Sequence, residues 1–136
     1  MAGIQELIRV EDNNKLSFGN HIMDEKKKIM GFEVDGDIYK VKTYNEITKL
    51  EKNGRLLFES VPGTTVHNFS LNDKIIDFKV EGKEDAQITL ELEVDQEYRI
   101  YINQIQVGKV KSNLAGKVSF SVEFTNGVQD VLIKKA

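Results

Sequence analysis

The sequence contains no cysteine and no tryptophan, and it has a single proline in 136 residues. Without cysteine the chain can form neither disulfides nor thiolate metal sites, and it has no cysteine nucleophile. Such a composition is typical of a reducing compartment. The absence of tryptophan removes the aromatic side chain with the largest face for stacking on a sugar ring.

Histidine is nearly as scarce, because His21 and His67 are the only two. Neither has a second nitrogen or carboxylate at metal-ligand spacing, and a zinc or iron site needs three or four such ligands. The sequence also has no Gly-x-Ser-x-Gly motif and no glycine-rich phosphate loop. We therefore expect no metal, no cofactor and no catalytic residue.

Long hydrophobic runs are missing too, since no stretch approaches the roughly 18 apolar residues of a membrane helix. The N-terminal segment lacks the basic start and the apolar run of a signal peptide. These absences predict a cytoplasmic protein with no membrane partner.

The chain has no excess of cations, because 19 lysines and arginines are interleaved with 22 aspartates and glutamates to give a net charge of −3. Nucleic-acid-binding proteins usually carry a clustered basic face, so we expect no nucleic-acid partner. Lys26, Lys27 and Lys28 form the only basic cluster along the sequence, directly after Asp24 and Glu25. This cluster is predicted to be a solvated turn or an edge strand.

Alternation of apolar and polar residues is abundant, and it is densest from residue 66 to residue 133. From Val118 to Phe124, every second residue is bulky and apolar. Successive side chains of a strand point to opposite faces of a sheet, so a period of two is typical of half-buried strands. The sequence therefore predicts an all-β fold, an antiparallel β-sandwich of immunoglobulin-like or jelly-roll-like type, from about residue 66 onward. The strands expected there are residues 66–71, 75–80, 86–94, 98–102, 105–110, 117–124 and 128–134.

The turn signature Val61-Pro62-Gly63-Thr64 marks an internal boundary. Residues 1–62 are expected to form a half rich in β-hairpins, with a type I′ turn at Asp35-Gly36, and residues 63–136 the seven-stranded sandwich. The same pattern also allows one continuous domain. Alternation further predicts the inward-facing side chains, which are Ile76, Phe78, Val80, Ile88, Leu90, Leu92, Val94, Tyr98, Ile100, Ile102, Phe120, Val122 and Phe124.

Two segments fit both helix and strand. Residues 2–10 have helical spacing of their apolar side chains, but so short a segment also fits an edge strand. In residues 43–52, Thr43 and Glu46 could form a helix capping box. The following Asn53-Gly54 is typical of a β-hairpin turn, so we favour the hairpin there.

Tyr101 and Arg99 are the strongest candidates for a binding site. Both should point away from the face that holds Tyr98 and Ile100, and a tyrosine beside an arginine can stack on a sugar ring or on a partner side chain. The interpretation that we favour for Tyr101 is that it covers the outer sheet where the N-terminal half packs. Tyr39 and Arg55 complete the set of candidate ligand-binding residues.

Four stretches resemble a family of small β-rich bacterial proteins of uncharacterised function, some of which are named endosialidases. They are Tyr39-Lys-Val-Lys-Thr43, Glu59-Ser-Val-Pro-Gly-Thr64, the segment from Glu81 to Leu90 and the segment from Gly108 to Lys117. The resemblance implies activity on polysialic acid, with Arg9, Arg55 and Arg99 as the available arginines. The repeated Ser-x-Asp-x-Gly-x-Thr-Trp boxes of sialidases are absent, so no catalytic residue is carried over.

These observations lead to two hypotheses. The first is a non-catalytic β-sandwich module for protein or glycan binding or assembly, whose unpaired sheet edges favour a homo-oligomer. The alternative is a glycan hydrolase that cleaves polysialic acid. That reaction requires Arg55, Arg99 and a pair of carboxylates to converge on one cleft.

Overall fold

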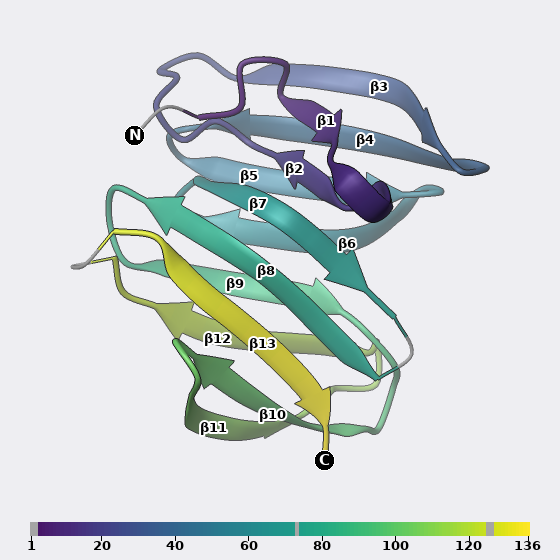
Figure 1. The fold of residues 1–136 in the computed structure, drawn as a ribbon, viewed down its shortest axis with the longest axis vertical. Helices are drawn as coiled ribbons and strands as arrows, with labels where there is room; N and C mark the ends of the chain where they lie inside the picture. The colour runs from purple at the N-terminus through teal and green to yellow at the C-terminus, as the bar shows by residue number, and fades with distance from the viewer. Residues whose placement is uncertain (1–2, 73, 125–126) are drawn as a thin grey trace.

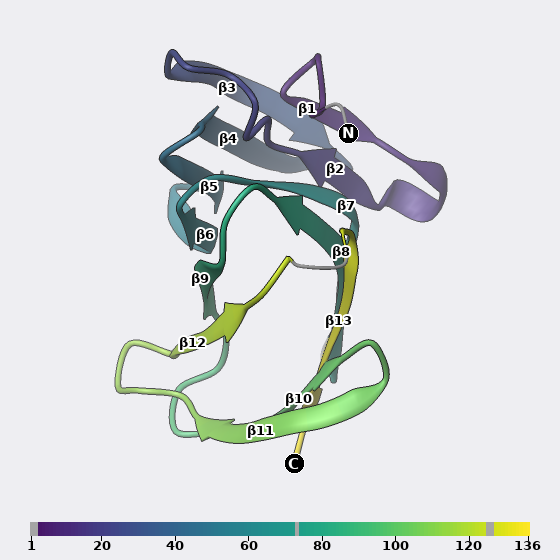
Figure 2. The same ribbon diagram turned by 90° about the vertical axis from the view of Figure 1, so that its left-hand side faces the viewer.

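The structure, a computed structural model, describes residues 3–72, 74–124 and 127–136. The fold is all-β, as the alternation predicts, and consists of two antiparallel sheets with seven and six strands. Figure 2 shows the sheets facing each other, with β10 and β11 curving beneath the space between them. None of the described segments forms a helix long and apolar enough to cross a membrane.

The seven-stranded sheet begins with the N-terminal strands and ends with a hairpin from the C-terminal half (Figure 1). Its strands, in spatial order, are β1 (Ile8–Val10), β2 (Leu16–Phe18), β7 (Thr64–Leu71), β8 (Ile75–Gly82), β13 (Gln129–Lys135), β10 (Glu97–Ile102) and β11 (Ile105–Lys111). The segment of residues 2–10, which fits both helix and strand by its sequence, therefore ends in an edge strand.

The six-stranded sheet is a run of hairpins with two C-terminal strands added to one edge. Its strands, in spatial order, are β12 (Lys117–Val122), β9 (Ala86–Glu91), β6 (Arg55–Val61), β5 (Ile47–Lys52), β4 (Asp37–Tyr44) and β3 (Lys27–Val34). The favoured hairpin is confirmed, since β5 and β6 pair across Asn53 and Gly54.

Each sheet combines strands from both sides of Pro62. In the seven-stranded sheet β2 pairs with β7, and in the six-stranded sheet β6 pairs with β9. The two halves of the sequence therefore share both of their sheets.

Four phenylalanines join the sheets at the centre of the core. Phe58 of β6 lies 5.2 Å from Phe18, 5.8 Å from Phe78 and 6.2 Å from Phe69, measured between ring centroids. All three contacts are edge-to-face, the arrangement that aromatic rings prefer. Phe58 is fully buried, and it packs its sheet against three rings of the other sheet.

The predicted inward side chains are buried or half-buried, with one exception. Val94 is 58% exposed, so its assignment to the core is wrong. The alternation continues past Glu91, but β9 ends there and the chain turns, with Asp95 at a φ of 52°. Alternation predicts on which face of the sheet a side chain lies only within a strand, and Val94 lies beyond the end of β9.

Buried hydroxyl groups lie at the end of the sandwich where β4, β5, β6 and β7 meet. Thr48 Oγ1 lies 2.8 Å from Thr43 Oγ1 and donates to the Thr64 carbonyl at 2.7 Å. Among the described residues, no buried side-chain nitrogen or oxygen lacks a hydrogen-bond partner. The nearby Gly63 is required by space, because a Cβ atom there would lie 2.0 Å from the Tyr44 carbonyl oxygen.

Candidate functional site

Arg99 and Tyr101 lie on the outer face of the seven-stranded sheet. Tyr98 and Ile100, which alternate with them along β10, are buried on the inner face. Arg99 stands directly opposite Lys109 of β11 on one side and Lys134 of β13 on the other. The Lys134 ammonium lies 5.6 Å from the centroid of the Tyr101 ring, within the range of a cation–π contact.

The N-terminal half does not cover Tyr101. Strands β1 and β2 extend the same sheet at its far edge, whereas β10 is next to the opposite edge (Figure 1). In the sheet register, the neighbours of Tyr101 are Gln106 and Leu132. Tyr101 and Arg99 therefore sit together on an open face, and their role in binding stays a prediction.

Tyr39 lies on the inner face of β4 and is only 9% exposed. It lines a hollow of about 260 Å³ with Lys52, Leu57 and Phe69. Burial, and to a lesser degree the Asp37 carboxylate, raises the pKa of the Tyr39 hydroxyl. The ring therefore faces the space between the two sheets, and its role in binding stays a prediction.

Arg55 begins β6, immediately after the hairpin turn, and is paired with Glu91 of β9. Its Nη2 and Nε atoms lie 2.7 Å and 3.0 Å from Glu91 Oε1. Arg55 and Arg99 belong to different sheets, so the structure does not bring these two arginines to one cleft.

The sequence reasoning missed a larger group of cations on the outer face of the six-stranded sheet. Lys28 of β3, Lys42 of β4 and Lys49 of β5 stand directly opposite one another in adjacent strands. Lys40 of β4 and Lys26, just before β3, extend this group. We call these five residues, Lys26, Lys28, Lys40, Lys42 and Lys49, the lysine face.

The charges of the lysine face act on one another. Burial has the largest effect on the Lys42 ammonium and lowers its pKa. The positive charges of the four other lysines lower it further. Two carboxylates offset them in part: Glu51 Oε2 is 3.8 Å from Lys49 Nζ, and Glu59 stands opposite Lys49 in β6. Like charges directly opposite in a sheet are destabilising, so this arrangement costs folding free energy.

One signal for the lysine face is present in the sequence, the run from Lys26 to Lys28. Lys40, Lys42 and Lys49 are spread over two other strands, and their neighbours in the sequence are uncharged. Only the register of β3, β4 and β5 brings them together. The predicted edge strand is also observed, since β3 is the last strand of its sheet.

The two histidines have structural partners. His21 Nδ1 lies 2.7 Å from Thr65 Oγ1, and His67 Nε2 lies 2.6 Å from Glu81 Oε2. In the described ranges no three His, Asp or Glu side chains are grouped so that they could hold a metal ion.

Comparison with known proteins adds no relative: no family model, no curated protein and no solved structure matches the chain.

Proposed function

We propose that the protein is a non-catalytic β-sandwich module that binds an acidic glycan chain through the lysine face. The observation that carries the proposal is the row formed by Lys28, Lys42 and Lys49, three cations directly opposite one another in adjacent strands. A ligand with carboxylates placed over this row would remove the repulsion between the ammonium groups. Binding would thus offset the destabilisation that the repulsion between the lysines causes in the folded protein.

The surroundings of the row favour a glycan over a nucleic acid. The whole chain carries a net charge of −3, which repels a polymer as densely charged as DNA. Single-stranded nucleic acids are usually bound by several aromatic side chains in a basic groove. On the outer face of β4, Lys40 and Lys42 lie between Ile38 and Tyr44, one aliphatic and one aromatic side chain. Such a surface suits a chain with isolated carboxylates and apolar sugar faces.

Binding without cleavage is the better supported of the two hypotheses. Hydrolysis of polysialic acid needs a pair of carboxylates on either side of one bond, close to the groups that hold the sugar. On the lysine face, Glu51 is engaged with Lys49, and Arg55 is paired with Glu91 elsewhere. The two carboxylates described beside this face, Glu51 and Glu59, both lie next to Lys49 and offset its charge, and this supports binding without cleavage.

A glycan array followed by calorimetry at low salt tests the proposal. The wild-type protein should bind acidic glycans and leave their neutral counterparts unbound. The double variant Lys42→Glu/Lys49→Glu should weaken binding by roughly tenfold or more, because it replaces two attractive charges by repulsive ones. The matched control is Arg99→Glu/Lys134→Glu on the other sheet, with Tyr101→Ala beside it, and these variants should bind like the wild type.

Each other result counts against the proposal. Equal binding of neutral glycans would remove the role of charge, and binding of DNA or anionic vesicles in place of glycans would change the ligand class. Loss of binding in the Arg99→Glu/Lys134→Glu control, with the lysine variant unaffected, would move the site to the other sheet.

A further inference from the structure

β12 leaves one edge of the six-stranded sheet unpaired. It is the last strand in the sheet, and among the described strands it pairs with β9 alone. Leu92 N donates to the Gly116 carbonyl at 2.7 Å, whereas the Lys117 carbonyl accepts from Asn113 N on the opposite side. Main-chain groups alternate in direction along a strand, so those of Ser119 and Ser121 point outward, away from β9.

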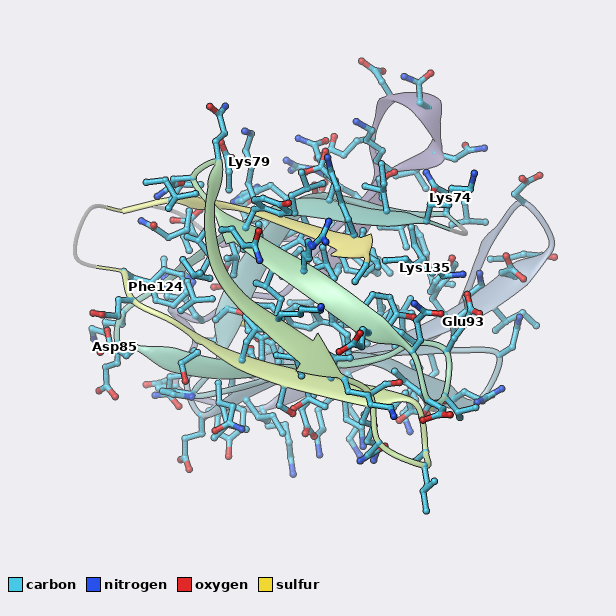
Figure 3. The ribbon with its side chains drawn as sticks, turned by 90° about the horizontal axis from the view of Figure 1, so that it is seen from below. Lys74, Lys79, Asp85, Glu93, Phe124 and Lys135 are labelled. Atoms are coloured by element: carbon cyan, nitrogen blue, oxygen red, sulfur yellow. The ribbon has the colours of Figure 1, made fainter. Side chains whose placement is uncertain are left out.

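The open edge of β12 can be reached from outside. β11 belongs to the other sheet, and from the loop that joins its end to the start of β12 the two strands diverge (Figure 2). Seen from below, Phe124, just after β12, lies on the left-hand side of the molecule, and Glu93, near the start of β12, lies on the right-hand side (Figure 3). Ser119 and Ser121 are exposed, and Phe120 between them is only half-buried.

The sequence of this edge is symmetric about Phe120. Reading outward from Phe120 gives Ser119 and Ser121, then Val118 and Val122. The next pair, Lys117 and Glu123, has opposite charges. Two copies of the segment placed antiparallel, with Phe120 opposite Phe120, therefore match at every position: serine with serine, valine with valine, and lysine with glutamate.

We propose that a second copy of this chain pairs with the first through β12, antiparallel, about a two-fold axis at Phe120. In this register Ser119 of one copy faces Ser121 of the other, and both have outward main-chain groups. Their N–H and C=O groups can form four hydrogen bonds across the axis, with no change in the pairing of β12 and β9. A shift of the register by two residues keeps the hydrogen bonds but loses the match of Lys117 with Glu123.

The side chains support the same register. Within the part of the chain that the structure describes, neither Lys117 nor Glu123 takes part in an ion pair. In the dimer, Lys117 of each copy would lie opposite Glu123 of the other copy, which gives two ion pairs. Phe120 would face its own copy in a non-hydrogen-bonded pair, where side chains of neighbouring strands lie closest. Both lysine faces would then lie on one continuous sheet, yet the pairing does not depend on ligand binding.

A charge-exchange experiment by analytical ultracentrifugation tests the dimer. The wild-type protein should change from monomer to dimer as its concentration rises. Lys117→Glu and Glu123→Lys should each raise the dissociation constant by roughly tenfold or more, because each places like charges opposite across the axis. The double variant Lys117→Glu/Glu123→Lys should dimerise like the wild type, and an equimolar mixture of the two single variants should form a heterodimer. Lys109→Glu, on the exposed face of β11, is the matched control and should behave as wild type.

Two results would overturn the proposal. One is a wild-type protein that stays monomeric at millimolar concentration. The other is a dimer that neither single reversal weakens, since it would use a different surface. Circular dichroism of each variant shows that it is folded, and the recovery in the mixture excludes a loss of dimer through misfolding.

Discussion

Folding changes the environment of the His21 imidazole. Its side chain is buried, with 8% exposure for the whole residue, and its Nδ1 atom is hydrogen-bonded to Thr65. Burial is the largest effect on the imidazole and lowers its pKa. The Glu81 carboxylate opposes this effect, whereas the Lys83 ammonium adds to it.

This environment predicts a loss of stability on mild acidification. The pKa of His21 is lower in the folded state than the unfolded-state value of about 6.5, so the unfolded state takes up the proton first as the pH falls. The contribution of His21 is complete above that pH and is lost below it. Thermal unfolding measured from about pH 7.5 to about pH 5.5 should show a falling midpoint in the wild type and a smaller fall in His21→Gln. An unchanged fall in His21→Gln would assign the effect to another group.

For a single residue, the sequence predicts the face of the strand on which it lies but not its neighbours in other strands. Period-two alternation assigns Arg99 and Tyr101 to an outer face, and the structure places them there. It gives no information on neighbours in other strands, so the meeting of Arg99 with Lys109 and Lys134 could not be derived. The inward position of Tyr39 follows from the same alternation.

Turn chemistry predicts the elements of this fold well. Asp35 and Gly36 have φ values of 51° and 87°, and Asn53 and Gly54 have 51° and 81°, as type I′ turns require. The segment of residues 43–52 fits both helix and strand, because Thr43 and Glu46 suit a helix capping box whereas Asn53 and Gly54 suit a hairpin turn. The pairing of β5 with β4 and β6 decides in favour of the strand, an effect of tertiary structure that no local pattern contains.

One hairpin carries a residue that its turn does not favour. Asn103 and Gln104, between β10 and β11, have φ values of 52° and 72°. Glutamine has a Cβ atom and gains no local hydrogen bond in the left-handed region, whereas glycine adopts it without strain. Gln104→Gly should therefore stabilise the protein by about 1 kcal/mol in urea unfolding. The control Gln106→Gly, within β11, should destabilise it, and an equal loss in both variants would contradict the role of backbone strain.

At the scale of the whole molecule, the arrangement of strands in the sheets is what the sequence conceals. Fold class and strand positions follow from local patterns, but the order of strands depends on contacts between distant segments. The lysine face and the symmetric edge show the difference. The symmetry of β12 is visible in the sequence alone, whereas its position at a sheet edge is not. The lysine face exists only through the register of three strands.

The sharing of both sheets by the two halves predicts that residues 63–136 do not fold alone. Without residues 1–62, β9 loses β6 and β7 loses β2, and the core loses the rings of Phe18 and Phe58. Removing a single buried phenylalanine ring costs about 3–5 kcal/mol, which is comparable to the stability of many domains. The isolated fragment should therefore show no cooperative thermal transition by circular dichroism, and addition of the fragment 1–62 should restore one. A cooperative transition of 63–136 by itself would instead mean that the C-terminal strands form a sandwich of their own and that the N-terminal strands only extend it.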